Sequence, residues 1–346
     1  VAALLTWAAL NVVGGGEKVA REVQQAQAEI FAAVDRQVTA WGIEHNELGW
    51  RADAYLYCVE VCDPESGWMV PLAPSWVIGE KTETVAKLTP DSKNKRYVIE
   101  IHQGVTDKEM KAARNSGTVK SSRLIPPDGG ASTPIEMIRR NLRLWDNEDL
   151  VPRPEDIFQE RLYCIRWVET YYEMQEGRRK KELGKEEAEK LPDFEELLQA
   201  GTLKQKTRRH YRAPTDADLK REAKVLELLR ERFHDWQEKG YIPSRRIEPG
   251  AKTDEPIRTR GWTHWHHLFT PRQLLQIGLF AEKVCLFIRD VQRIAGILAI
   301  GRFADWNSRL CRWIADASKE NGAQTFSNQA LNTLYNFYNR PTLLLA

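Results

Sequence analysis

Residues 1–50 carry apolar side chains in a pattern typical of amphipathic helices. Residues 1–12 are rich in Ala and Leu, which favour the helix. After the glycines at 14–16, apolar residues recur near one face of a segment from about 17 to 41. A glycine-rich loop that binds phosphate normally follows a strand, whereas here the preceding segment is helical in character. A glycine cap between two helices is therefore favoured.

Between residues 51 and 150 the pattern changes to short β-type runs, separated by clusters of Pro, Gly and Asp. Thr106 followed by Glu109 has the sequence signature of a capping box, which predicts one helix inside this region. The region is therefore expected to be a small β-rich module between helical segments. The expected strands are 54–61, 68–72, 84–88, 97–101 and 119–125.

Residues 151–250 are predicted to begin with a strand at 161–170. The charged stretch at 176–190 is predicted to be a solvated helix or a mobile insertion, as such runs usually are. A second basic stretch, 204–212, precedes an expected amphipathic helix at 216–239. This part of the chain thus combines a strand, a charged insertion and a helix.

Residues 251–346 are predicted to be mainly helical. Thr270 as the N-cap, Pro271 at the first helical position and Gln273 at the N3 position together mark a strong helix start. From 274 to 300 the sequence is apolar nearly all round, which predicts a buried helix. Further helices are expected at 303–313 and 325–338.

Overall composition narrows the function classes only slightly. The 51 Lys and Arg against 49 Asp and Glu give a net charge of +2, so any nucleic-acid-binding surface has to be local. The five cysteines are an odd, scattered set, which suits free thiols in a reducing compartment such as the cytoplasm. The apolar start stops at Val13, too short for a transmembrane helix, so no membrane association is expected. Both ends are abrupt and are expected to be edges within a longer protein.

The residue patterns that bind metals are incomplete in this sequence. Cys58 and Cys62 are separated by three residues, and a zinc ribbon needs a second pair of ligands. The next cysteine is Cys164, and His102 is the only histidine between, so a tetrahedral site cannot be assembled locally. Two buried thiols in a strand are favoured, and no metal is expected.

The segment 262–267, Trp-Thr-His-Trp-His-His, concentrates ring side chains and leaves three interpretations open. Two imidazoles on one face of an extended segment could begin a metal site, but acidic or cysteine partners are lacking nearby. Together with Arg258 and Arg260, the rings could instead form a stacking and phosphate-binding surface. Core packing with satisfied histidines is favoured over both.

An asparagine stripe offers a further candidate. Asn328, Asn332 and Asn336 recur at helical spacing in the last expected helix, and asparagine can bind adenine through two hydrogen bonds. A solvent face or an interhelical hydrogen-bond line is the more frequent cause of such spacing. The sequence contains no nucleophile elbow and no Walker loop, and its carboxylates form no recognisable general acid–base pair.

The segment 258–275, which begins Arg-Thr-Arg-Gly-Trp-Thr-His-Trp-His-His, resembles a signature of one family. These are large adenine-specific DNA methyltransferases that carry the domain of unknown function 1156 and are often encoded in anti-phage defence clusters. Other blocks resemble the same proteins in the same order, so the similarity runs, patchily, through nearly the whole chain. These blocks are 68–76, 132–135, 305–313 and 326–334.

The resemblance also carries an expectation about a zinc ribbon that many family members contain. The positions of its four cysteines correspond here to Asp63, Ser66, Pro126 and Gly129. Since Pro and Gly have no metal-binding side chain, the resemblance implies a degenerate ribbon whose turns persist without zinc.

The family's catalytic and cofactor motifs do not occur in this sequence. The family holds the target amine with an Asp-, Asn- or Ser-Pro-Pro-aromatic tetrapeptide and S-adenosylmethionine with a glycine-rich strand–loop. The only Pro-Pro pair, at 126–127, is followed by Asp128. The resemblance therefore implies an α/β or α+β fold in which helices flank an incomplete Rossmann-like core, with the β-rich module inserted. Residues 1–50 would belong to that core, and residues 251–346 would lead into the catalytic half.

The resemblance implies part of an S-adenosylmethionine-dependent DNA adenine-N6 methyltransferase of an anti-phage defence or restriction-modification system. Its expected partners are DNA and other defence-system proteins. The alternative is a non-catalytic DNA-binding or scaffold protein of a defence complex. No catalytic residue is expected in this chain, and no cofactor-binding residue is assigned. The residues expected to contact DNA are Arg208, Arg209, Arg212, Arg258, Arg260, Trp262, His264, Asn328 and Asn332.

Overall fold

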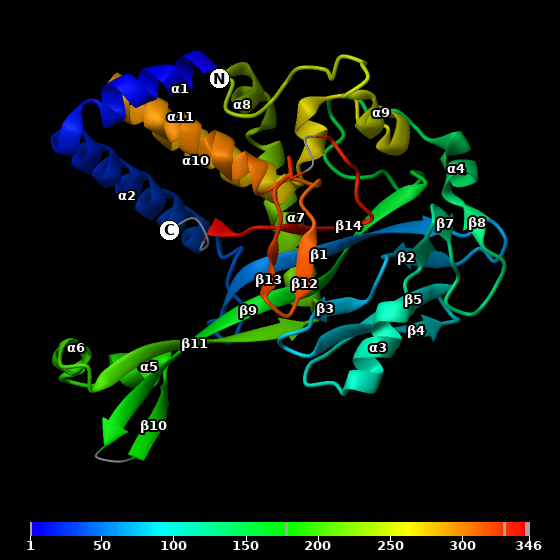
Figure 1. The fold of residues 1–346 in the computed structure, drawn as a ribbon, viewed down its shortest axis with the longest axis horizontal. Helices are drawn as coiled ribbons and strands as arrows, with labels where there is room; N and C mark the ends of the chain where they lie inside the picture. Colours follow the sequence, from blue (N-terminus) through cyan, green and yellow to red (C-terminus); the bar gives the residue numbers. More distant parts are fainter. Residues whose placement is uncertain (1, 177–178, 328–329, 343–346) are drawn as a thin grey trace.

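The computed structural model describes residues 2–176, 179–327 and 330–342 (Figure 1). Within them, a nine-stranded mixed sheet forms the centre, in the order β10-β9-β1-β2-β5-β4-β3, with β11 paired to β9 and β14 paired to β1. Among these described strands, every pair is antiparallel except β2 with β5. The strands are β1 (Arg51–Cys62), β2 (Met69–Leu72), β3 (Val77–Gly79), β4 (Thr84–Asp91), β5 (Arg96–His102), β9 (Phe158–Glu176), β10 (Arg179–Gly184), β11 (Leu203–Arg212) and β14 (Asn336–Asn339).

A layer of helices packs at one end of the sheet, in the upper left of Figure 1. Its core joins apolar side chains such as Val34, Val225 and Leu274, each of which is fully buried. These helices are α1 (Ala2–Ala8), continued by a π-helical turn (Ala9–Val13), α2 (Gly16–Trp41), α7 (Asp216–Arg230), α8 (Phe233–Glu238), α10 (Pro271–Cys285) and α11 (Asp290–Asp305).

Several smaller elements complete the fold. Two short sheets lie outside the main one, β6-β7-β8 and the hairpin β12-β13. These elements are α3 (Asp107–Asn115), β6 (Val119–Lys120), β7 (Arg123–Leu124), β8 (Thr133–Pro134), α4 (Ile135–Ile138), a 3₁₀ turn (Arg139–Asn141), α9 (Asp254–Arg260), a 3₁₀ turn (Trp265–Leu268), β12 (Trp313–Asp316) and β13 (Lys319–Gly322).

The far half of β9, together with β10 and β11, projects from the body as an arm, in the lower left of Figure 1. Two short helices, α5 (Lys185–Glu189) and α6 (Phe194–Gln199), belong to this arm. Tyr172, Leu183 and Leu203 form its small core together with apolar residues of these helices. The arm therefore has one face covered by helices and one face left open.

The expected mixture of sheet and flanking helices is confirmed, and so are most local signals. Four of the five expected strand runs between 51 and 150 coincide with strands of the structure, and the fifth, 119–125, is instead a hairpin of the two short strands β6 and β7. The capping boxes at Thr106 and Thr270 are both formed, and each hydroxyl accepts a hydrogen bond from the backbone N–H three residues later. Strands β1 to β5 of the expected β-rich module share one sheet with β9, β10, β11 and β14, whereas β6, β7 and β8 form a separate small sheet, so strands from both sides of residue 150 belong to the main sheet.

Several expected elements are wrong. The helix expected over 274–300 breaks between α10 and α11. In the charged stretch at 176–190, expected to be a solvated helix or a mobile insertion, residues 179–184 form strand β10 and only 185–189 form a helix, α5. The helix expected at 303–313 ends at Asp305. The described part of 325–338 contains no helix, and its end forms β14, because Phe337 and Tyr338 are buried against β1. The helix expected over 216–239 is split into α7 and α8.

The two segments that the resemblance assigns to degenerate zinc knuckles, around Asp63 and Gly129, both form hydrogen-bonded turns. The Asp63 carboxylate accepts hydrogen bonds from the backbone N–H and the hydroxyl of Ser66. In the second turn, Gly129 N–H donates to the Pro126 carbonyl at 3.2 Å. Gly129 has a φ of 82°, a conformation that glycine adopts without strain. Side-chain and backbone hydrogen bonds therefore hold both turns.

Candidate nucleic-acid interface

The segment 262–267 enters the core immediately after α9. Gly261 ends that helix with a φ of 74°, and a Cβ atom here would lie 2.0 Å from the carbonyl oxygen of Arg143. Only glycine fits this close approach. Trp262 then packs edge-on against Trp145, with ring centroids 6.3 Å apart, and is only 4% exposed.

The three histidines of this segment are buried and hydrogen-bonded. His267 Nδ1 accepts from the backbone N–H groups of Thr263 and His264, and its Nε2 lies 2.9 Å from the Asp146 carbonyl. His266 Nε2 lies 3.1 Å from the carbonyl of Asn147. This is the core-packing arrangement that the sequence favoured. Within the described residues, no group of His, Cys, Asp and Glu side chains is arranged to hold a metal ion.

Burial keeps these imidazoles neutral. Desolvation, followed by the neighbouring His264, lowers the pKa of His266 to about 4. Desolvation, followed by His266 and Arg309, lowers the pKa of His267 to about 2. Protonation of either ring would place an uncompensated charge in the core. His264 is buried as well, so it lies away from any surface that could contact DNA.

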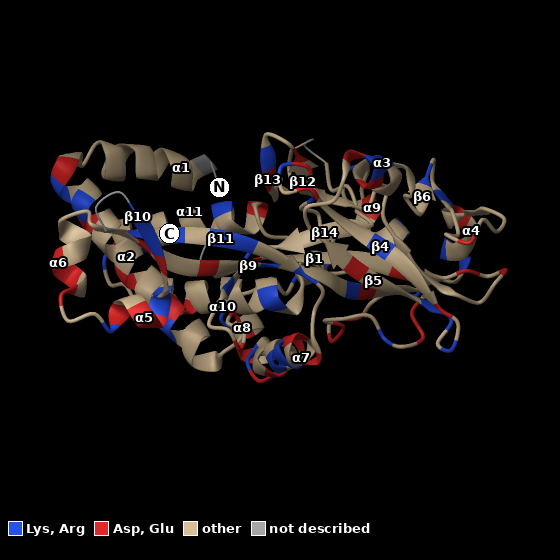
Figure 2. Cartoon of the chain, turned by 90° about the horizontal axis from the view of Figure 1, so that it is seen from below, with Lys and Arg blue, Asp and Glu red and all other residues tan. Residues whose placement is uncertain are grey.

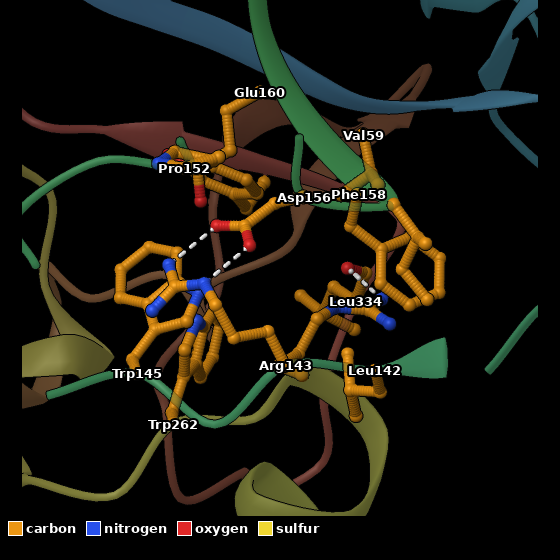
Figure 3. A pocket seen from close by; sticks show the side chains of 13 residues that line it. Val59, Leu142, Arg143, Trp145, Pro152, Asp156, Phe158, Glu160, Trp262 and Leu334 are labelled. Atoms are coloured by element: carbon orange, nitrogen blue, oxygen red, sulfur yellow. Dashed lines mark hydrogen bonds and ion pairs between the residues drawn. The ribbon is translucent and has the colours of Figure 1, made fainter. Parts of the chain in front are cut away.

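A small pocket lies beside this segment (Figure 3). Its volume is about 20 Å³, which is room for about one water molecule and far too little for a nucleobase. Figure 3 shows the two tryptophans on one side and apolar side chains such as Leu142 and Leu334 on the other, with the ion pair of Arg143 and Asp156 between them. The pocket therefore belongs to the packed interior.

The other residues expected to contact DNA from this end of the chain are scattered. Arg260 is 4% exposed, whereas Arg258 on the same helix is exposed and lies 3.8 Å from both Asp254 and Glu255. Asn332 is exposed but lies in a non-helical segment. Asn328 lies outside the described residues. Within the described residues, the expected row of asparagines on one helix face is therefore not formed.

Strand β11 instead concentrates positive charge on one face. Side chains two residues apart in a strand point the same way, about 7 Å apart. The pairing of β11 with β9 runs without a register shift, so alternate residues keep one face along the whole strand. Blue segments mark the Lys and Arg of β11 in Figure 2. The residues of this face, called here the basic face, are Lys204, Lys206, Arg208, His210 and Arg212.

Part of this charge is compensated by carboxylates of neighbouring strands. Arg208 lies 3.1 Å from Glu182 and 3.6 Å from Glu169, and His210 lies 2.7 Å from Glu169. Among the described residues, no carboxylate forms an ion pair with the exposed Lys204, Lys206 or Arg212. These three cations are therefore available to an external anion. Of the residues expected to contact DNA, Arg208 and Arg212 lie on the basic face.

Arg209 points to the other side of β11, where its Nε lies 3.3 Å from the buried carboxylate of Asp53. Asp53 also accepts a hydrogen bond from the buried Arg166. The structure therefore separates Arg209 from Arg208 and Arg212, although all three were expected to act together.

Aromatic rings lie under two of the cations. The Arg208 guanidinium is 4.6 Å from the centre of the Tyr171 ring, and that of Arg212 is 4.5 Å from the Trp50 ring. His210 stacks on Trp50 with 4.1 Å between ring centroids and 7° between planes. Cations interleaved with aromatic rings are the groups with which proteins bind nucleic-acid backbones and bases.

A groove of about 990 Å³ runs beside this surface, between the arm and the loop that follows α2. Its charge is mixed, because Lys185 and Lys190 face it together with several glutamates. The groove is lined by His45, Leu48, Gly49, Trp50, Arg51, Val168, Glu169, Thr170, Gly184, Lys185, Glu186, Glu187, Glu189 and Lys190.

No protein-family model, no curated protein and no solved structure matches this chain. The methyltransferase resemblance thus rests on the sequence blocks alone. Among the described residues, no helix combines the length and the apolar character needed to cross a bilayer. The sequence-based prediction did not include Lys204 and Lys206 of the basic face, or the rings of Tyr171 and Trp50 that lie beside it. The sequence does contain a signal for the two lysines, because basic residues occur at every second position from 204 to 212. In a strand this spacing places them on one face, so the signal can be interpreted only when 203–212 is assigned as a strand.

Proposed function

We propose that this chain is part of an S-adenosylmethionine-dependent DNA adenine-N6 methyltransferase and that it contacts DNA through the basic face of β11. The single observation that carries the DNA contact is the row of cations on one exposed strand face, of which Lys204, Lys206 and Arg212 form no ion pair with a carboxylate of the described residues. The methyl-transfer part of the proposal is supported by the resemblance of 258–275 and the ordered blocks around it.

The remaining features of the proposal concern the longer protein. The Rossmann-like core, the S-adenosylmethionine site and the catalytic tetrapeptide would be completed by polypeptide outside residues 1–346. The hydrogen-bonded turns at Asp63 and Gly129 support descent from a zinc ribbon that has lost its metal. Other defence-system proteins are proposed partners, and a cytoplasmic location is proposed from the free thiols.

We expect the chain to bind duplex DNA with an affinity that falls steeply with salt, because each neutralised phosphate releases counterions. Replacing Lys204, Lys206 and Arg212 together by glutamine should reduce the magnitude of the slope of log K against log salt by about 2–3 units, since each phosphate contact contributes about 0.9. Fluorescence anisotropy with a labelled duplex at several salt concentrations measures this slope.

A matched triple variant provides the control. Lys93, Lys108 and Lys111 are exposed and lie on or near α3 and the β4–β5 turn, away from the arm in Figure 1. Their replacement by glutamine removes the same net charge and should leave the slope nearly unchanged. Equal slopes for the two triple variants would show that β11 is not the DNA contact.

The enzymatic part is tested on the longer protein that contains this chain. That protein should transfer the labelled methyl group of S-adenosylmethionine to adenine in DNA, and the Lys204/Lys206/Arg212 triple variant should lose most of this transfer at physiological salt. Calorimetry with S-adenosylmethionine distinguishes the methyltransferase from the alternative, a non-catalytic DNA-binding protein. A protein that binds DNA but shows no heat of cofactor binding and no methyl transfer is the non-catalytic DNA-binding protein, and the methyltransferase proposal then fails.

A further inference from the structure

Arg260, at the end of α9, is a buried cation that forms no ion pair with any carboxylate of the described residues. Its guanidinium donates hydrogen bonds to two backbone carbonyls, of Thr259 at 3.0 Å and Leu334 at 2.9 Å. It lies 4.7 Å from the centre of the Phe158 ring and 5.0 Å from that of Tyr335. Its Nε has no hydrogen-bond partner. Within the described part of the chain, no carboxylate forms an ion pair with it.

A second arginine adds positive charge to the same place. Arg139 donates a hydrogen bond to the Tyr335 hydroxyl at 3.2 Å, and its Nε is also buried without a partner. Burial lowers the pKa of Arg260 to about 10; the charge of Arg139 acts in the same direction, and the carboxylates of Glu160 and Glu255 act against it. Arg260 therefore remains protonated at neutral pH, in surroundings that disfavour its charge.

The pocket of Figure 3 is lined in part by Arg260. Two carboxylates also line it, but each is bound by another arginine. Asp156 pairs with Arg143 at 2.6 Å, and Glu160 pairs with Arg309 at 2.7 Å. Of the described charged side chains that line the pocket, Arg260 is thus the one without an ion-pair partner, and the more distant carboxylates of Glu160 and Glu255 offset its charge only in part. An isolated buried charge is costly, and charges in protein interiors are normally paired.

We infer that this pocket holds a single-atom anion, of the size of chloride, against the Nε of Arg260. A volume of about 20 Å³ admits one atom of about the size of a water molecule and excludes phosphate, sulfate and carboxylates. The anion supplies the missing counter-charge and the missing acceptor together. It also ties α9 to the segment that carries Leu334 and Tyr335. This site is independent of the proposed DNA contact, which lies on the arm.

Unfolding by urea in potassium chloride and in potassium gluconate at the same ionic strength tests the site, because gluconate is too large for the pocket. A dissociation constant on the order of 10 mM would raise the folding equilibrium constant about tenfold at roughly 0.1 M chloride. Arg260→Met should remove this difference between the two salts. Arg258→Met, on the same helix but exposed, should retain it.

Equal stability of the wild-type chain in the two salts would overturn the inference. So would a chloride effect of the same size in Arg260→Met as in Arg258→Met. If Arg260→Met fails to fold, crystals of the wild-type chain soaked in bromide decide the question. An anomalous peak within hydrogen-bond distance of Arg260 Nε supports the site, and its absence means that the pocket holds water or nothing.

Discussion

Replacement of Arg309 by methionine is expected to lower the free energy of unfolding by about 3–5 kcal/mol, because it breaks a buried ion pair and leaves the carboxylate of Glu160 without its partner. The Arg309 side chain is fully buried and lies 2.7 Å from Glu160. It donates further hydrogen bonds to the carbonyls of His267 at 2.7 Å and Leu150 at 3.1 Å. Methionine fills similar space but provides none of these donors.

The position of Arg309 explains why the effect should be large. Its guanidinium is 5.4 Å from the ring of Trp145 and 5.5 Å from that of Trp262, so it lies close to both tryptophans of the Figure 3 pocket. It therefore links the segment after α11 to the histidine segment and to β9. Removing it disturbs three parts of the chain that are far apart in sequence.

Chemical denaturation of the purified variants measures this change. Arg312→Met is the matched control, since Arg312 is exposed and three residues away, and its effect should stay within about 0.5 kcal/mol. Arg309→Lys should fall between the two, because lysine keeps the charge but lacks the planar fork that reaches several acceptors. A loss of stability in Arg309→Met no larger than in Arg312→Met would contradict the role assigned to the ion pair.

The sequence predicted those helices and strands that are determined by residues close together in the chain. The capping boxes at Thr106 and Thr270 depend on side chains within one helical turn, and both form. The strand runs of 51–150 are likewise recognisable from their own residues. The break between α10 and α11 has no such signal, because residues 286–288 are apolar, contain neither Gly nor Pro, and are followed by Arg289, an N-cap residue that makes no side-chain cap hydrogen bond.

The end of the chain shows why other elements could not be predicted. The residues of β14 pair with β1, across nearly the whole sequence, and Asn336 lies opposite Cys58. Tyr338 packs where a Cβ atom on Gly322 would lie 1.6 Å from its ring. These contacts are non-local and override the helical spacing of the asparagines. The same reasoning applies to Arg260 and Trp262, whose burial depends on Trp145 and Phe158, distant in the sequence.

Acidification from pH 7 to pH 5 is expected to lower the free energy of unfolding by about 4 kcal/mol through His266 and His267 alone. The pKa of each is lowered by burial, to about 4 and about 2, from a usual value of 6.5. Below pH 6.5 the unfolded chain therefore binds protons that the folded chain does not, so stability falls as pH falls. The loss continues down to about pH 4 for His266 and further for His267.

His267→Asn isolates one half of this effect, since the asparagine oxygen can still accept from the backbone N–H groups of Thr263 and His264. The difference between the free energies at pH 7 and pH 5 should shrink by about 2 kcal/mol in this variant. His234→Gln, at an exposed site, should leave the difference unchanged. Carboxylates that titrate in the same range contribute equally to all three proteins and cancel in the comparison. An identical pH dependence in wild type and His267→Asn would mean that His267 is not held neutral by the core.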